Sequence, residues 1–136
     1  MRVMVFVKAN EQSEAGVMPG TELLTEMGRF NEELAAAGVL EAGEGLHPSS
    51  RGKRMRFSGK TSTVIDGPFA ETKELVAGFW IWKVGSIDEA LEWLRRSPFR
   101  DGEVEIRPVF EPEDFGDALT PDLKAREAAL RARTRH

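Results

Sequence analysis

Two stretches of the chain have the pattern of β-strands that are apolar on both faces, and this constrains the fold more than any other feature. In residues 2–8 (RVMVFVK), one face carries valines and the other carries Met4 and Phe6. Residues 78–84 (GFWIWKV) repeat the pattern with larger side chains. A strand with one face in water would alternate apolar and polar residues. We therefore expect both sides of the sheet that these strands form to be covered.

The order of the predicted elements indicates the fold class. Besides the two strands above, the patterns predict a helix at residues 21–37, a strand at residues 39–46 and a hairpin of residues 53–57 with 61–65. They also predict a second helix at residues 86–97 and a last strand at residues 103–109. This order is typical of an α+β fold with a ferredoxin-like antiparallel sheet and two helices on one face. The helices leave the other face bare. A second copy is the simplest cover, which predicts a homodimer.

Local signals mark the ends of the helices. We expect Thr21 to cap the first helix and Gly38 to end it in the left-handed conformation. Ser86 opens a capping box at the start of the second helix. Thr120, followed by a proline, is expected to open a C-terminal tail helix that runs to about residue 132. An acidic, proline-containing linker at residues 111–116 precedes it.

Length and charge bound the class of protein. The chain has 136 residues, of which 40% are hydrophobic, so we expect one domain at residues 1–115 and a tail at residues 116–136. The net charge is −4, and the tail carries five basic and three acidic side chains, so the domain carries −6. A mildly acidic domain is a poor phosphate binder. We therefore expect no direct nucleic-acid ligand.

Several residue types and motifs are missing from the sequence. The chain has no cysteine, which excludes disulfides, thiol nucleophiles and cysteine-ligated metals. Its two histidines stand far apart, at His47 and His136, so no metal is expected. No glycine-rich phosphate loop or dinucleotide fingerprint points to a cofactor. The apolar runs are too short for a signal sequence or for the ~18 residues of a membrane span, so we expect a cytoplasmic protein.

The densest set of polar groups follows the hairpin, at residues 64–74 (VIDGPFAETKE). Asp66 ends a strand, and the Gly67–Pro68 turn holds its carboxylate in a defined direction. Such a carboxylate can move a proton in a pocket; its structural alternative is to bond backbone N–H groups of its own turn. His47, in the turn before the hairpin, has the side chain best suited to acid/base chemistry at neutral pH, or it is simply a turn residue.

Charged side chains near this loop are candidates for ligand binding. Glu71 and Lys73 would form a charged rim at the mouth of a pocket, or a solvated turn with weak ion pairs. Arg54 and Arg56 share one strand face, where they would clamp a carboxylate or guard an edge strand against aggregation.

Three aromatic side chains complete the candidate set. Trp80 and Trp82 fit the core or a dimer interface, and both are also suited to line an aromatic ligand pocket. Phe69 is expected to anchor the loop.

The Asp66–Phe69 motif (DGPF) resembles the signature of the YCII-related (DGPF-motif) family. The GEGL, DEA and EIRP runs at residues 43–46, 88–90 and 105–108 fit as well, and the resemblance extends from residue 1 to about residue 115. It implies a dimeric α+β barrel, in which ferredoxin-like protomers pair through their sheets. A few relatives are small-molecule enzymes, such as a dehydrochlorinase acting on a chlorinated hydroquinone, and a His–Asp pair is proposed as catalytic. Other members occur with extracytoplasmic-function sigma factors, which implies an accessory role.

Two functions follow as hypotheses. The first is a cofactor-free acid/base enzyme of isomerase or lyase type, with Asp66 as base and His47 as partner acid. It would act on a small molecule in a pocket between the helices and the sheet. The second is a non-enzymatic accessory or regulatory module associated with an extracytoplasmic-function sigma factor. The charged loop at residues 71–74 and the tail helix favour it.

Overall fold

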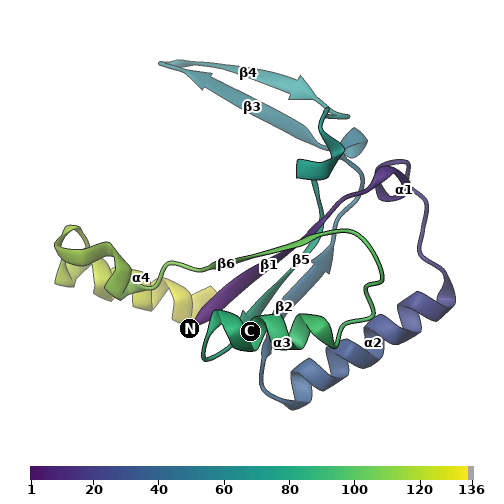
Figure 1. Cartoon of the computed structure of the whole chain (residues 1–136). Helices are drawn as coiled ribbons and strands as arrows, with labels where there is room; N and C mark the ends of the chain where they lie inside the picture. Colours follow the sequence, from purple (N-terminus) through teal and green to yellow (C-terminus); the bar gives the residue numbers. More distant parts are fainter. Residues whose placement is uncertain (135–136) are drawn as a thin grey trace.

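The computed structural model describes residues 1–134 apart from the side chain of Lys73, so His136 lies outside the described residues. The chain forms an antiparallel sheet with two long helices on one face, a separate hairpin and a tail (Figure 1). The elements are β1 (Arg2–Lys8), α1 (Glu11–Glu14), α2 (Thr21–Ala36), β2 (Leu40–Gly45), η1 (Ser49–Arg51), β3 (Lys53–Ser58), β4 (Thr61–Asp66), η2 (Thr72–Glu74), β5 (Val76–Lys83), α3 (Ile87–Arg95), β6 (Val104–Pro108), η3 (Pro112–Ala118) and α4 (Pro121–Thr134).

The main sheet has four strands in the order β2-β5-β1-β6, and each neighbouring pair is antiparallel. The register of the two central strands places Trp80 and Trp82 opposite valines of β1 on one face. The alternate positions face the other way; they are Met4, Phe6, Phe79 and Ile81. The predicted mixed α+β class is therefore confirmed, and so is the two-faced apolar character of both strands.

Helices α2 and α3 cover the tryptophan face. Phe30 of α2 packs edge-on against both indoles, with ring centroids 5.8 Å from Trp80 and 6.2 Å from Trp82. The buried cluster comprises Val3, Val5, Phe30, Leu34, Val39, Trp80, Trp82, Val84 and Ala90. Trp80 and Trp82 are thus core residues, and Trp80 donates its indole N–H to Asn31 Oδ1 at 2.9 Å. This packing fills the space between helices and sheet where we expected a pocket.

Gly43 on the edge strand β2 makes room for the core. A Cβ at this position would lie 2.5 Å from Cδ1 of Trp80, closer than any carbon–carbon contact allows. The indole therefore lies against bare backbone, which explains a glycine inside a strand.

The helix ends follow most of the predicted signals. Gly38 ends α2 with φ 73°, and the Ser86 hydroxyl accepts from Glu89 N at 3.1 Å. The Glu89 carboxylate accepts from Gly85 N instead of Ser86 N, so only half of the predicted capping box forms. Thr120 caps α4 by accepting from Leu123 N at 3.3 Å. The prediction for Thr21 is wrong. It is the first residue of α2, and Gly20 occupies the cap position without a side-chain hydrogen bond.

Two predicted loops contain short helices. The acidic linker coils into η3, because Glu111 and Asp114 each accept a backbone N–H of the other's residue in a capping box. The polar loop after β1 holds α1, whose cap Asn10 accepts from Ser13 N at 2.8 Å. No helix within residues 1–134 is long and apolar enough to cross a membrane.

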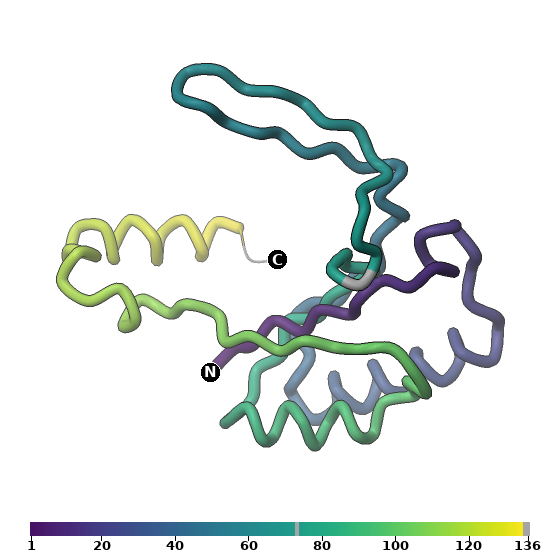
Figure 2. The backbone as a smooth tube through the Cα atoms, turned by 45° about the horizontal axis from the view of Figure 1, so that its top comes forward, coloured from purple at the N-terminus to yellow at the C-terminus, as the bar shows by residue number. Residues whose placement is uncertain are grey.

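Two appendages leave the body on the side of the sheet away from α2 and α3 (Figures 1 and 2). The β3–β4 hairpin, which we call the arm, forms a two-stranded sheet of its own and projects outward. The tail, from η3 through α4, extends from the opposite end of the sheet. The face between them carries Met4, Phe6, Phe79 and Ile81, and we call it the open face.

Candidate functional site

The base of the arm gathers most of the predicted site residues. The register of the hairpin places Lys53 directly opposite Asp66. Lys53 Nζ donates to Asp66 Oδ1 at 2.5 Å, and the two side chains are 68% and 73% exposed. Asp66 is thus the acidic member of a surface ion pair in the single chain.

Gly67 permits the closest backbone approach in this region. A Cβ there would lie 1.8 Å from the carbonyl oxygen of Ser49, so only glycine fits. Gly67 N donates to Gly52 O at 3.0 Å, and the bond between Gly67 and Pro68 is cis. The turn after Asp66 is therefore pressed against the turn that precedes β3.

Ser49 connects three segments at this point. Its hydroxyl donates to Glu14 Oε2 at 2.5 Å, and its backbone N–H donates to Glu14 Oε1 at 2.9 Å. Phe69 N in turn donates to Ser49 Oγ at 3.0 Å. Through this one hydroxyl, helix α1, the turn before β3 and the DGPF turn are held together.

Phe69 and the arginines of β3 flank the base. The Arg54 guanidinium lies 3.9 Å from the centre of the Phe69 ring, at cation–π distance. Arg56 is exposed two residues further along the same face of the arm. Phe69 is half-buried and anchors the loop through these contacts.

His47 lies in the same region but has a different partner from Asp66. Arg51 Nη1 is 3.0 Å from Nδ1 and 3.1 Å from Nε2 of His47. A nitrogen equidistant from both ring nitrogens lies off the axis of either lone pair, so the contact orients the ring only weakly. No hydrogen bond joins His47 to Asp66 within the described residues.

The charged rim after the motif is described in part. Glu71 has φ 61°, a left-handed conformation that is uncommon for a residue other than glycine, and its side chain is exposed. The side chain of Lys73 lies outside the described residues. The neighbouring Glu74 reaches Lys8 at 3.7 Å.

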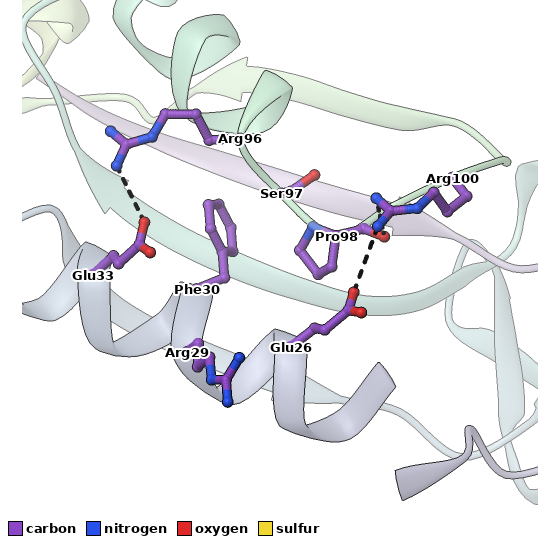
Figure 3. A pocket seen from close by; sticks show the side chains of 8 residues that line it. All are labelled: Glu26, Arg29, Phe30, Glu33, Arg96, Ser97, Pro98 and Arg100. Carbon is purple, nitrogen blue, oxygen red and sulfur yellow. Dashed lines mark hydrogen bonds and ion pairs between the residues drawn. The ribbon is translucent and has the colours of Figure 1, made fainter. Parts of the chain in front are cut away.

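Two open hollows, of about 220 and 410 Å³, lie along α2, on the helical side of the molecule away from the arm. Figure 3 shows the smaller one, with the Phe30 ring and Pro98 between two ion pairs. Arg96 pairs with Glu33 at 3.1 Å, and Arg100 with Glu26 at 3.8 Å. These four charges satisfy each other, whereas Arg29, which also lines the hollow, has no ion-pair partner among the described residues.

A match to a known protein family covers most of the chain. The YCII-related domain family matches residues 1–113, which include β1, both main helices, the arm and the DGPF turn. The chain belongs to the YCII-related family. The match ends before α4, so the tail helix lies outside it.

Two similar proteins give context for this YCII-related chain. An uncharacterized protein of Rhizobium meliloti (strain 1021) is 32% identical over 90 residues, which cover 64% of this chain and 73% of that protein. A solved structure of 5-chloro-2-hydroxyhydroquinone dehydrochlorinase from Burkholderia phenoliruptrix AC1100, in complex with 2,5-dihydroxybenzoquinone, is 14% identical with a TM-score of 0.48. That likeness covers 82% of this chain and 95% of the other, and it says nothing about what this chain binds.

Sequence reasoning missed three residues of this site. Lys53 was missed because the predicted strands, 53–57 and 61–65, pair residue 57 with residue 61 and set Lys53 opposite Ile65. The observed pairing of Ser58 with Thr61 sets it opposite Asp66. Glu14 and Ser49 gave no signal in the sequence. They lie 35 positions apart, in two segments that the sequence predicts as loops, so nothing in their spacing indicates a contact.

Replacing Ser49 with alanine tests the structural role of the DGPF turn. Ser49→Ala removes a donor to Glu14 and the acceptor for Phe69 N. Because these groups lose their partners, the local stability of the turn should fall by roughly 1–3 kcal/mol. We expect the amide of Phe69 to exchange with solvent at least about tenfold faster in NMR-detected hydrogen exchange. The matched control is Ser50→Ala, because Ser50 makes no side-chain hydrogen bond within the described residues. Equal exchange rates in the two variants would contradict the role given to Ser49.

Proposed function

We propose that this YCII-related chain works as a homodimer of ferredoxin-like protomers, packed through the open faces of their sheets as a dimeric α+β barrel. The observation that carries the proposal is the open face itself. Its centre is a patch of four half-buried apolar side chains, Met4, Phe6, Phe79 and Ile81, on the side of the sheet away from the helices. Burying such a patch is worth about 25 cal/mol per Å² of apolar surface, and a second copy is a partner of equal shape.

The margins of the open face support the same proposal. Arg2 and Lys8 lie at the two ends of β1, on the same face as Met4 and Phe6. Arg2 pairs with Glu111 at 2.9 Å, and Lys8 pairs with Glu105 at 3.4 Å. The hydrogen bond to Glu111 raises the pKa of Arg2 above its ordinary value, which keeps this rim charge in place. An apolar centre with a charged rim is the usual anatomy of a protein–protein interface.

Within this dimer we place a cofactor-free acid/base site at the arm base, acting on a small molecule. Asp66 is the base and His47 the partner acid, as in an isomerase or lyase. In one chain the Asp66 carboxylate is largely exposed, and a proton-transferring carboxylate gains from exclusion of water. The second copy would supply that cover, since the arm and the open face lie on the same side of the sheet.

A charged residue at the centre of the open face tests the dimer. The wild-type chain is expected to sediment at twice its 15.1 kDa mass, whereas Ile81→Lys should raise the dimer dissociation constant roughly 100-fold or more. The reason is that each dimer loses two apolar side chains, worth about 1.5–3 kcal/mol each. Leu91→Lys, on the exposed side of α3, is the matched control and should leave the dimer intact. A wild-type chain that stays monomeric at every concentration would refute the proposal.

Removing the carboxylate tests the acid/base site without a known substrate. A library of small polar and aromatic metabolites is incubated with the protein in D₂O, and NMR detects loss of carbon-bound protons. Asp66→Asn keeps an oxygen for Lys53 but cannot take a proton, so exchange should fall by about 10²- to 10⁴-fold. Glu32→Gln, which removes an exposed carboxylate of α2 on the side of the sheet away from the arm, should leave exchange unchanged. Full exchange activity in Asp66→Asn would rule out its role as base.

The second candidate function is an accessory binding module, and the exposed helix α4 favours it. Its leucines Leu123 and Leu130 are 44% and 56% exposed, so the helix has an apolar side that no part of the described chain buries. The partner that the family resemblance implies is an extracytoplasmic-function sigma factor. If this function holds, purified extracytoplasmic-function sigma factor should bind the full chain at least about tenfold more tightly than a chain lacking residues 117–136. Equal binding of the two, or none, would count against it.

A further inference from the structure

The arm has two faces of different chemistry. Side chains alternate along each strand, and residues that pair across the hairpin share a face. The register therefore places three exposed apolar side chains on one face, namely Met55, Phe57 and Val64. The opposite face, which we call the basic face, carries Arg54, Arg56, Ser58, Thr61, Thr63 and Ile65. Only Ile65 among these six is apolar, and it is half-buried.

The arm is a positively charged element of an acidic chain. Residues 53–66 carry four basic side chains and one acidic one, a net charge of +3, so the rest of the chain carries −7 against a total of −4. Lys53 is paired with Asp66. The other three basic side chains, Arg54, Arg56 and Lys60, have no carboxylate partner within the described residues. The sequence predicted no nucleic-acid ligand because the net charge of the domain conceals this separation.

The unpaired charges are accessible to a long ligand. Figures 1 and 2 show that the arm leaves the body at its base and stands clear of it beyond that point. Arg54 and Arg56 are exposed and stand two positions apart on one strand, a spacing of ~7 Å. Exposed charges act within about 8 Å at physiological salt. A ligand that lies along the arm is therefore attracted by the arm more than it is repelled by the acidic body.

The side chains of the basic face suit phosphate better than protein. Proteins contact DNA phosphates largely with arginine, lysine, serine and threonine side chains. A protein–protein interface has an apolar centre, which a face with the single half-buried Ile65 does not provide. The Arg54 guanidinium lies 3.9 Å from the centre of the Phe69 ring, and such stacking orients a guanidinium while leaving its N–H donors free.

The shape of the arm favours one kind of nucleic acid. Its two strands lie about 4.8 Å apart, and the major groove of B-form DNA, about 12 Å wide, admits a two-stranded β-ribbon. The major groove of duplex RNA is too narrow and deep for side chains to read. Phosphates and the edge of guanine both accept two hydrogen bonds from a guanidinium, so the DNA groove offers acceptors to Arg54 and Arg56.

We infer that the arm binds double-stranded DNA with its basic face in the major groove, a function separate from the acid/base site proposed above. Arg54, Arg56 and Lys60 supply the attraction to phosphate. Ser58 and Thr63 add hydroxyl groups on the same face. The apolar face of the arm then lies on the side away from the DNA.

Fluorescence anisotropy of a labelled DNA duplex of about 20 base pairs tests this inference on the full chain. We expect a dissociation constant of about 10⁻⁴–10⁻⁶ M at about 50 mM salt. The logarithm of the affinity should fall against the logarithm of salt concentration with a slope of about −2.7, which is about −0.9 for each of three neutralised phosphates. Arg54→Ala with Arg56→Ala should bring the slope to about −0.9 and weaken binding at least about tenfold.

Two further variants separate charge from fold and place. Arg29→Ala with Lys124→Ala removes the same charge from exposed side chains of α2 and α4, and both slope and affinity should stay as in the wild type. Arg54→Lys with Arg56→Lys keeps the charge of the basic face and should keep the slope.

Four results would overturn the inference. They are a wild-type chain that does not bind the DNA duplex, an unchanged slope in the alanine variant of the arm, a lost slope in the lysine variant, and equal affinity for an RNA duplex of the same length. The last result would mean that phosphate attraction acts without a fit to the groove.

Discussion

A sheet that is apolar on both faces, with helices for only one of them, is the constraint on which the rest of this structure depends. The tryptophan face receives α2 and α3, and its side chains form the core. The other face retains Phe6, Phe79 and their neighbours at half burial. The arm and the tail from η3 through α4 lie on that second side. The distribution of the helices therefore determines where the chain has surface to offer a partner.

The DGPF motif has a structural role in this chain that is independent of any catalytic role. Gly67 touches the Ser49 carbonyl, Phe69 donates its amide to the Ser49 hydroxyl, and Asp66 pairs across the hairpin with Lys53. These contacts join the arm to the body. A catalytic Asp66 remains compatible with them, because a carboxylate has a second oxygen with free acceptor positions.

Most of the local structure could be predicted from the sequence, because local signals determine it. The lack of apolar–polar alternation predicted that both faces of β1 and β5 are apolar. Gly38 and Thr120 marked helix ends, the first through its left-handed backbone and the second through its side-chain hydroxyl. Thr21 misled because the residue before it, Gly20, takes the extended cap conformation equally well. The separation of the arm from the main sheet could not be predicted, since a period of two identifies a strand but not its neighbours. The same holds for the site. The contact between Glu14 and Ser49 depends on how three loops meet in space.

The tight contact at Gly67 makes the arm a lever. Six residues per strand give it a length of ~20 Å, so a tilt of about 10° at the base would displace its tip by ~3.5 Å. A larger residue in place of Gly67 would push against Ser49 and tilt the arm at its base. The largest displacement would then occur at the tip of the arm. Loss of function on altering a DGPF motif is therefore not sufficient evidence that its aspartate performs chemistry. In a protein built this way, the motif can control alignment at a surface far from the altered residue.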